Sequence, residues 1–246
     1  MKITYLRNSG FIVETTECML IFDYIAAPDG SVLTDGVLKP KDLNRPNVYV
    51  FVSHGHSDHF NPAIFAWREV NPTIKYILFR DAKRLVPKSS QMKFMDEGRQ
   101  YSDNNLHVRA YGSTDEGISF LVRVDGIDIF HAGDLNLWHW KEECPAEESE
   151  MYALIFYNEM EKILDDLHAP VDVAFFPFDP RLGADYYEGA LYFSKKVKPR
   201  YMVPMHFSGN FSLVNQVKED IERCGVQFVP LHGYGDVQVL DVEEPT

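Results

Sequence analysis

The chain has 246 residues, of which 45% are hydrophobic and 13% aromatic, so it is long enough to bury a full core as one domain. Its 37 acidic and 24 basic residues give a formal charge of −13. That balance argues against binding to long nucleic acid, which depends on cations that neutralise phosphates. It does not exclude a small phosphorylated substrate, because a bound metal ion reverses the local field.

The sequence shows no sign of membrane insertion or of an oxidising compartment. No stretch approaches the roughly 20 consecutive apolar residues of a membrane helix, and the first residues lead straight into a strand-like pattern without an apolar signal segment. The three cysteines, Cys18, Cys144 and Cys224, are odd in number and widely spaced, which predicts neither a disulfide framework nor a thiolate metal cluster. We therefore expect a cytoplasmic protein.

The first fifty residues predict a series of short strands separated by turns. The expected strands cover residues 3–7, 11–15, 19–23 and 48–53, and a loop rich in proline and glycine lies between residues 28 and 46. Asn61 and Pro62 then predict an N-cap followed by a first helical residue, so we expect a helix over residues 63–70.

The remainder of the chain predicts more strands and then an alternation of strands with helices. Strands are expected at residues 75–79, 106–111, 118–124 and 127–131, and Asp125-Gly126 between the last two is typical of a hairpin turn. The acidic stretch at 141–150 is interpreted as a solvated loop. Helices are expected over residues 152–167, 186–197 and 213–223, with strands at 171–176, 201–204, 227–229 and 237–240. These elements indicate a single α/β domain over residues 1–246, in which two sheets lie between helices.

The most informative segment is the end of the strand at residues 48–53, where three histidines and a carboxylate follow within six residues. His54 and His56 occupy alternate positions of an extended segment and therefore point the same way. Asp58 and His59 come after a turn and are placed to face a second ion. Imidazole and carboxylate are ligands of zinc, iron and manganese, so the segment predicts a metal site; a surface run of histidines is the alternative interpretation.

With this motif the sequence resembles the metallo-β-lactamase superfamily, whose signature is a strand followed by H-x-H-x-D-H. Residues 5–14 and 20–23 also look like the opening strands of that family, with Asp23 at its early acidic position. The resemblance implies an αββα sandwich of two mixed sheets flanked by helices and a metal-dependent hydrolase activity. It points to the branch of small cytoplasmic metal-dependent hydrolases that includes the lactonase acting on ascorbate 6-phosphate.

Two later segments extend the resemblance. Residues 130–134 look like the family segment that supplies a bridging aspartate, here Asp134, and residues 202–207 resemble the segment that carries the last histidine ligand, here His206. Taken alone, Asp134 also fits a turn cap and His206 a hydrogen-bonded core histidine. His131 is interpreted as a partner that orients a ligand, a role that metal sites commonly need.

The sequence departs from the family pattern at one position. The family has a further histidine in a turn between the two clusters, whereas here Ser113 stands at that position, and serine is a poor zinc ligand. Three outcomes are open. One metal is held by Asp58, His59, Asp134 and His206; or two metals are held, with Asp115 or His139 as the substitute ligand; or the chain is a scaffold that has lost activity.

A few other residues are candidates for the surroundings of the site. His232 lies where the closing segment of the family passes the site, but an exposed loop histidine is the favoured interpretation. Arg181 is able to contact a substrate anion through its fork of donors. Asp179, Tyr186 and Tyr187 are further candidates to line the pocket, with plain surface exposure as the alternative.

These observations predict a metal-dependent hydrolase that uses a metal-activated water on a small ester, lactone or phosphoester substrate. Asp58 is expected either to ligate the metal or to orient and deprotonate the water. Zinc is the expected cofactor, as one or two ions, with manganese or iron as alternatives. The competing hypothesis is a degenerate, non-catalytic metal-binding scaffold of the same fold. The sequence indicates no oligomeric state.

Overall fold

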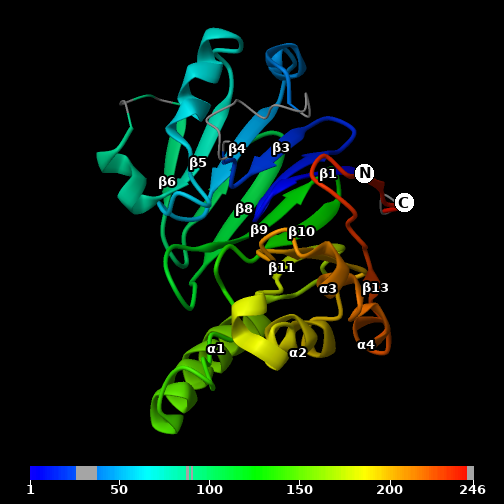
Figure 1. Ribbon diagram of the computed structural model, residues 1–246. Coiled ribbons are helices and arrows are strands. Elements are labelled where there is room, and N and C mark those ends of the chain that lie inside the picture. Colours follow the sequence, from blue (N-terminus) through cyan, green and yellow to red (C-terminus); the bar gives the residue numbers. More distant parts are fainter. Residues whose placement is uncertain (26–37, 87–88, 90, 243–246) are drawn as a thin grey trace.

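Two mixed β-sheets form the centre of the computed structural model, which describes residues 1–25, 38–86, 89 and 91–242 (Figure 1). Each sheet has seven strands within these residues. In order across the first sheet the strands are β14 (Val237–Val239), β1 (Lys2–Arg7), β2 (Gly10–Glu14), β3 (Met19–Phe22), β4 (Val48–Val52), β5 (Lys75–Phe79) and β6 (Met92–Met95). In the second they are β13 (Gln227–Phe228), β12 (Tyr201–Met205), β11 (Val173–Pro177), β10 (Ile127–His131), β9 (Ser119–Val124), β8 (Leu106–Tyr111) and β7 (Gln100–Ser102).

Each sheet is antiparallel in one half and parallel in the other. The strands from β14 to β3 and from β7 to β10 pair antiparallel, whereas β3 to β6 and β10 to β13 pair parallel. The parallel strands are almost entirely buried, as expected when both faces of a sheet are covered. The expectation of an αββα sandwich with two mixed sheets is confirmed.

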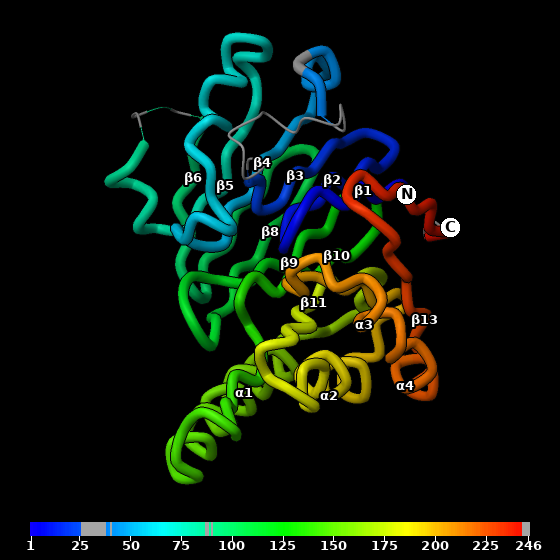
Figure 2. The backbone as a smooth tube through the Cα atoms, in the orientation of Figure 1, coloured from blue at the N-terminus to red at the C-terminus, as the bar shows by residue number. Residues whose placement is uncertain are grey.

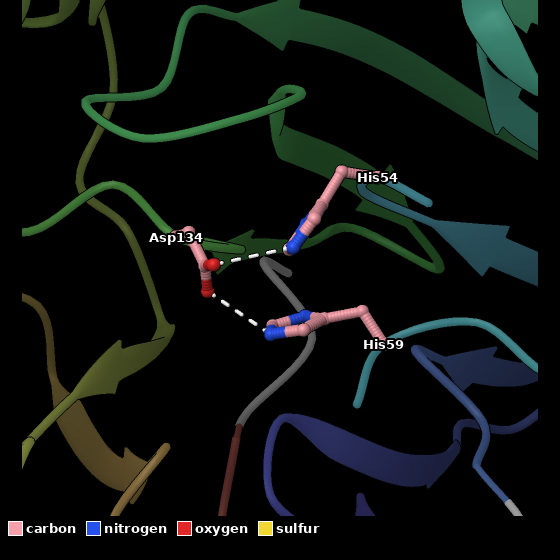
Figure 3. A group of neighbouring side chains, drawn as sticks. All are labelled: His54, His59 and Asp134. Carbon is pink, nitrogen blue, oxygen red and sulfur yellow. Dashed lines mark ion pairs between the residues drawn. The ribbon is translucent and has the colours of Figure 1, made fainter. Parts of the chain in front are cut away.

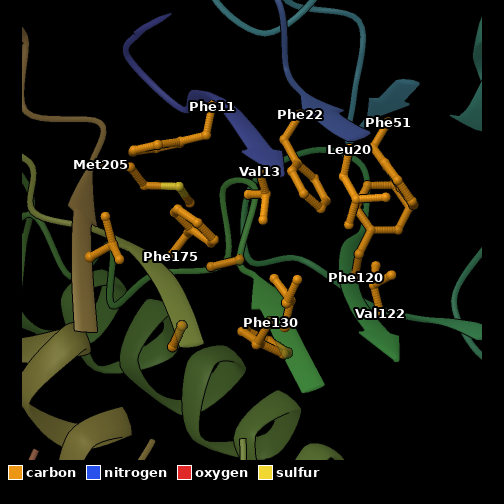
Figure 4. Close-up of a cluster of buried hydrophobic side chains, with 14 of the residues drawn as sticks. Phe11, Val13, Leu20, Phe22, Phe51, Phe120, Val122, Phe130, Phe175 and Met205 are labelled. Carbon is orange, nitrogen blue, oxygen red and sulfur yellow. The ribbon is translucent and has the colours of Figure 1, made fainter. Parts of the chain in front are cut away.

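The core lies between the two sheets and is built largely from phenylalanines (Figure 4). Phe11 of the first sheet contacts Phe175 of the second with ring centroids 4.5 Å apart, and Phe51 contacts Phe120 edge-on at 5.4 Å. All four side chains are completely buried. Such aromatic pairs fill the space between two stacked sheets and add to the free energy of burial.

Helices cover the outer faces of the sandwich, as the tube view also shows (Figure 2). On the side of the second sheet lie α1 (Ala146–Asp166), η4 (Pro180–Asp185), α2 (Glu188–Lys196), α3 (Phe211–Asn215) and α4 (Lys218–Glu222). Short 3-10 helices accompany the first sheet, namely η1 (Pro40–Leu43), η2 (Pro62–Glu69) and η3 (Arg80–Arg84). Among the described residues, no helix combines the length and apolar composition required to cross a bilayer.

The structure corrects several predicted elements. The helix expected over residues 63–70 is the 3-10 helix η2 over residues 62–69, and Asn61 caps it as expected by accepting from the backbone N–H of Ala63. The acidic stretch is partly helical, because α1 begins at Ala146 and its first-turn glutamates favour a helix N-terminus. The helix predicted over 213–223 is broken into α3 and α4. The strands β6 and β7 were not predicted, and most of the loop predicted between 28 and 46 lies outside the described residues.

One side chain in the turn between β7 and β8 links the two sheets. The carboxylate of Asp103 accepts hydrogen bonds from Tyr49 on β4 at 3.0 Å and from Lys75 on β5 at 2.6 Å. It also accepts from Tyr101 on β7 at 2.9 Å and from the backbone N–H of Asn105. Burial opposes the charge of Asp103, but the bonds from Lys75, Asn105 and the tyrosines outweigh it and lower its pKa from 3.8 to about 2.

We expect Asp103→Asn to lower the free energy of unfolding by about 2 kcal/mol at pH 7, because charge-assisted bonds between the sheets are lost. A carboxyl whose pKa is depressed by folding stabilises the protein above pH 4, and this contribution disappears as the pH falls toward 2. Thermal unfolding of both proteins from pH 7 to pH 3 checks this. The difference in Tm should shrink in the acidic part of the range, and a difference independent of pH would contradict the assignment.

Candidate metal centre

The candidate site lies where the parallel strands of both sheets end. In the first sheet, β3 leads into Asp23 and β4 leads into the loop that starts at Ser53. In the second sheet, β10 leads to Asp134, β11 to Asp179 and β12 to His206. The carboxyl ends of parallel strands meet at one edge of an α/β sheet, which is the usual place for a ligand. The order of the strands therefore gathers segments distant in the sequence at one edge.

A tight turn folds the histidine segment back on itself. The backbone N–H groups of His59 and Phe60 both donate to the carbonyl of His56, at 3.0 and 2.9 Å. Gly55 lies at the start of this turn, where a Cβ would be 3.0 Å from the ring of Phe79, so a larger residue would have to displace that ring. The turn brings His59 beside His54, with ring centroids 4.0 Å apart.

Asp134 is the meeting point of the first group of side chains (Figure 3). Its Oδ2 lies 3.2 Å from Nε2 of His54, and its Oδ1 lies 3.0 Å from Nε2 of His59. All three side chains are buried, yet His54 Nε2 and Asp134 Oδ1 make no hydrogen bond of acceptable geometry. Buried polar atoms normally have partners, so each of these two atoms fits the role of a ligand to a cation.

A second group adds ligands on the cavity side of Asp134. Nε2 of His206 lies 3.5 Å from Asp134 Oδ1 and 3.5 Å from Asp58 Oδ2. Nε2 of His59 lies 3.6 Å from the same Asp58 oxygen. Donor atoms of Asp58, His59 and His206 all fall within 4.8 Å of one another. The six residues named as ligands from the sequence are thus brought together, with Asp134 at their centre.

The loop at residues 112–118 supplies a third group. Asp115, His56 and Asp134 offer ligand atoms within 4.8 Å of one another, and Glu116 approaches His56 at 3.3 Å. The loop is held against the histidine segment by a bond from the N–H of Ile118 to the carbonyl of Ser53. Gly117 permits this approach, since its φ is +80° and a Cβ would lie 2.2 Å from that carbonyl oxygen.

Two buried carboxylates behind the site orient its histidines. Asp23 accepts from Nδ1 of His59 at 2.8 Å and also from the hydroxyl of Ser53, which lies 3.0 Å from Nδ1 of His54. Asp179 bonds Nδ1 of His206 at 2.9 Å. Both bonds leave Nε2 of the imidazole directed at the centre. Carboxylate–histidine pairs of this kind fix the tautomer and the ring orientation of metal ligands.

Two further residues that the sequence did not single out fix the backbone of the site. The side-chain amide of Asn8 donates to Oδ2 and to the backbone carbonyl of Asp58, both at 3.2 Å, and the backbone carbonyl of Asn8 accepts from the N–H of His206. The indole N–H of Trp138 donates to the carbonyl of Asp134 at 2.8 Å. These bonds connect the turn after β1 and the loop after β10 to the proposed ligands.

Charges within the cluster depend on one another. Burial disfavours the imidazolium of His59, but the carboxylates of Asp134 and Asp23 outweigh burial and raise its pKa to about 10. Burial is similarly outweighed at His206, where bonds to Asp179 and Asp58 raise the pKa to about 9. The pKa of Asp134 is held well below its ordinary value by His59, His54 and His206, despite burial that acts in the opposite direction. The cluster therefore stabilises ionised carboxylates at neutral pH.

The structure separates three other histidines from the centre. His131 bonds backbone groups, the carbonyl of Ser9 and the N–H of Gly133, instead of the side chain of a ligand. His139, considered as a substitute ligand, lies in a different group with Asp185 and Glu188, because the turn after Asn136 directs it toward η4 and α2. His232 is exposed, in agreement with the loop interpretation. The substitute that the structure brings to His56 is Asp115.

A cavity of about 510 Å³ opens beside Asp58 and His206. Arg7 and Arg181 line it, together with Asn8 and Tyr234. Arg181 is held by Asp179 and lies about 5.7 Å from the rings of Trp138 and Trp140. The cavity therefore joins the proposed ligands to two guanidinium groups. Two residues suggested as pocket lining lie elsewhere, since the hydroxyls of Tyr186 and Tyr187 bond Leu213 and Asp220.

Comparisons with known proteins identify the family of the chain. A family model described as a beta-lactamase superfamily domain matches residues 2–143. The chain belongs to the metallo-β-lactamase superfamily. Its relatives within the superfamily include two proteins named UPF0173 metal-dependent hydrolase. That of Desulforamulus reducens is 28% identical over 88% of both chains, and that of Archaeoglobus fulgidus is 27% identical over 91% of this chain and 90% of the other.

A solved structure shows the same fold over the whole length. Igni18 of Ignicoccus hospitalis, described as a novel metallo hydrolase, superposes with a TM-score of 0.68 and 20% identity, covering 98% of this chain and 99% of the other. At that identity the likeness shows the fold alone. The superfamily thus accounts for the sandwich, while the cluster of histidines and aspartates at the strand ends and its outer partners are described from the contacts of this chain.

If Asp23 orients His59, removing its charge should weaken metal binding without unfolding the protein. We expect Asp23→Asn to lower zinc affinity by about 10- to 100-fold, because the amide no longer stabilises the required imidazole orientation. Competition with a chelating dye measures the affinity. Asp103→Asn is the matched control, since it loses a partly buried carboxylate that touches no proposed ligand. Equal zinc affinity in Asp23→Asn and the wild type would remove Asp23 from the site.

Proposed function

We propose that this metallo-β-lactamase-fold protein is a zinc-dependent hydrolase of a small ester, lactone or phosphoester. The observation that carries the proposal is the convergence of six histidine and aspartate side chains around Asp134, at the edge of a cavity lined by two arginines. Relatives named metal-dependent hydrolase over most of their length support the hydrolase class. A lactone substrate corresponds to the lactonase branch that the sequence resembles.

The residues present fit one or two divalent cations. Asp58, His59, His206 and Asp134 would hold one of them, and His54, His56, Asp115 and Asp134 the other, with one oxygen of Asp134 facing each group. When bound, such a cation supplies positive charge that acidifies water and stabilises the oxyanion of an attacked carbonyl or phosphoryl group. Imidazole and carboxylate ligands suit zinc and also accommodate manganese or iron.

The chain itself contributes a proton acceptor beside the cavity. Asp58 is half exposed, and its contacts with Asn8, His59 and His206 all use Oδ2. The hydrogen bond from His206 lowers its pKa, so the carboxylate is ionised at neutral pH. We assign Oδ1 the role of orienting the attacking water and accepting its proton.

The arginines are assigned to substrate binding, and Asp179 behind the site is assigned to positioning other side chains. Arg7 and Arg181 line the cavity and are placed to hold an oxyanion of the substrate. Asp179 bonds both Arg181 and His206, so it sets the position of a substrate-binding group and of a proposed ligand together. Trp138 stacks on Trp140, and the guanidinium of Arg181 lies over both rings, which supports its position at the cavity.

The proposal predicts that the purified protein contains zinc and hydrolyses at least one member of a panel of lactones, phosphodiesters, thioesters and esters. Asp134→Asn should bind no metal, as measured by mass spectrometry, because the carboxylate shared by both groups of ligands is removed. Its kcat/KM should fall by at least about 100-fold. Asp103→Asn, which perturbs the fold away from the site, should keep the metal. A metal-replete wild type inert to the whole panel would instead favour a non-catalytic scaffold.

The number of ions depends on Asp115. We expect Asp115→Asn to reduce the zinc content from about two to about one per chain, because the group formed with His56 and Asp134 loses its charged oxygen. Titration calorimetry with zinc gives the stoichiometry. Asp81→Asn, an exposed carboxylate on η3, is the control and should leave two sites. An unchanged stoichiometry in Asp115→Asn would show that Asp115 is not the required ligand and would point to Glu116, which also faces His56.

A further inference from the structure

Positive charge is concentrated in one segment of an otherwise acidic chain. Residues 80–101 contain six basic and three acidic residues, whereas the whole chain contains 24 basic and 37 acidic residues. The six basic residues are Arg80, Lys83, Arg84, Lys88, Lys93 and Arg99. None of them was needed for the metal centre.

The structure gathers four of these cations around one cavity of about 520 Å³, formed by η3, β6 and β7. Arg80 and Lys83 come from η3, Lys93 from β6, and Arg99 from the turn that leads to β7. Because β6 and β7 are the outermost strands of the two sheets, the cavity lies at the edge of the sandwich. It shares no lining residue with the cavity beside Asp58.

Most of the positive charge in this cavity is not neutralised by the protein. Arg80 pairs with Asp96, and Glu97 is turned away toward Lys162 on α1 at 2.7 Å. Within the part of the chain that the structure describes, Lys83, Lys93 and Arg99 form no ion pair. Three exposed cations that line one cavity without an ion-pair partner among the described residues give the cavity a positive potential, which attracts anions.

Aromatic and apolar groups complete the lining. The rings of Phe94 and Tyr101 are partly buried in the cavity wall, and Met95 is buried. Lys93 lies 5.7 Å from the ring centroid of Tyr101, and the hydroxyl of Tyr101 is fixed by Asp103. A ring held in this way offers a rigid surface for stacking.

We propose that this cavity is a binding site for a small phosphorylated ligand of the nucleotide type, separate from the metal centre. Lysine and arginine side chains are the usual partners of phosphate oxygens, and the guanidinium fork adds paired donors. Phe94 and Tyr101 provide apolar surface for a base or another aromatic ring. The volume lies in the range of pockets that enclose small ligands.

A long nucleic acid is a poorer match to the same features. Four cations at one cavity provide phosphate contacts over a short distance only, whereas the rest of the chain carries an excess of acidic residues that would repel an extended backbone. A free nucleotide or inorganic pyrophosphate presents its charge at a single point. The two sources share the phosphoryl group and differ in the aromatic base.

Titration calorimetry of the zinc-loaded protein with ADP, pyrophosphate and adenosine at 50 mM KCl tests the proposal. We expect ADP to bind, adenosine alone not to bind, and affinity for ADP to fall when KCl is raised to 300 mM, because the charges are exposed. Lys93→Ala/Arg99→Ala should weaken ADP binding by at least about 10-fold. ADP affinity above that of pyrophosphate identifies a nucleotide, and equal affinities identify a phosphate site.

Lys195→Ala/Arg223→Ala is the matched control, because it removes the same charge from exposed positions, one in α2 and one directly after α4. It should leave ADP affinity unchanged, and Lys93→Glu should weaken it further than the loss of charge alone. If ADP instead bound to zinc at the metal centre, the Lys93→Ala/Arg99→Ala variant would bind ADP as tightly as the wild type does. Equal ADP affinity of the two proteins would therefore overturn the proposal. Tighter binding of a single-stranded oligonucleotide than of ADP would overturn it as well.

Discussion

The buried negative charge of Asp134 is the constraint on which the site depends. This carboxylate lies where the second sheet meets the histidine segment of the first, and its two oxygens face His54 on one side and His59 and His206 on the other. An ionised carboxylate at such a position is costly unless cations or donors surround it. The imidazoles that stabilise this negative charge come from the ends of β4 and β12. The contacts that hold the two sheets together at this edge are therefore also the contacts that form the candidate metal centre.

The backbone around this charge is held in conformations that few residues adopt. Asn8, Asp23 and His206 all have positive φ, between 40° and 57°, although none is a glycine. Gly133 has a φ of +55°, and a Cβ there would lie 2.9 Å from Cβ of Ser53. Non-glycine residues in this region are strained, and such strain persists only where surrounding contacts determine the geometry. Here those contacts are the hydrogen bonds that Asn8, Asp23 and Asp179 make to the proposed ligands.

The strands and the leading histidines could be predicted from the sequence because both are local patterns. Alternation and turn residues located most strands, and the spacing of His54, His56, Asp58 and His59 indicated a metal site. The carboxylate partners of the histidines could not be predicted, because they are distant in the sequence. Asp23 pairs with His59, 36 positions away, and Asp179 pairs with His206, 27 positions away. Spacing in the sequence also could not choose between Asp115 and His139 as the substitute ligand. His139 is closer to Asp134 in the sequence, but the folded backbone directs its side chain toward Asp185 and Glu188, whereas the fold brings Asp115 beside His56. The sequence marked the start of η2 at Asn61 but not its 3-10 geometry, since capping residues serve both helix types.

The strand β5 connects the candidate metal centre with the cavity lined by Arg80, Lys83, Lys93 and Arg99. It ends at Phe79, whose ring lies against Gly55 between the two leading histidines, and the next residue, Arg80, lines the cavity at η3. The residue that lines one cavity and the residue that packs against the histidine turn are therefore adjacent in the chain, and the ring of Phe79 is closely packed. The two cavities are chemically separate, yet a single strand end supports both.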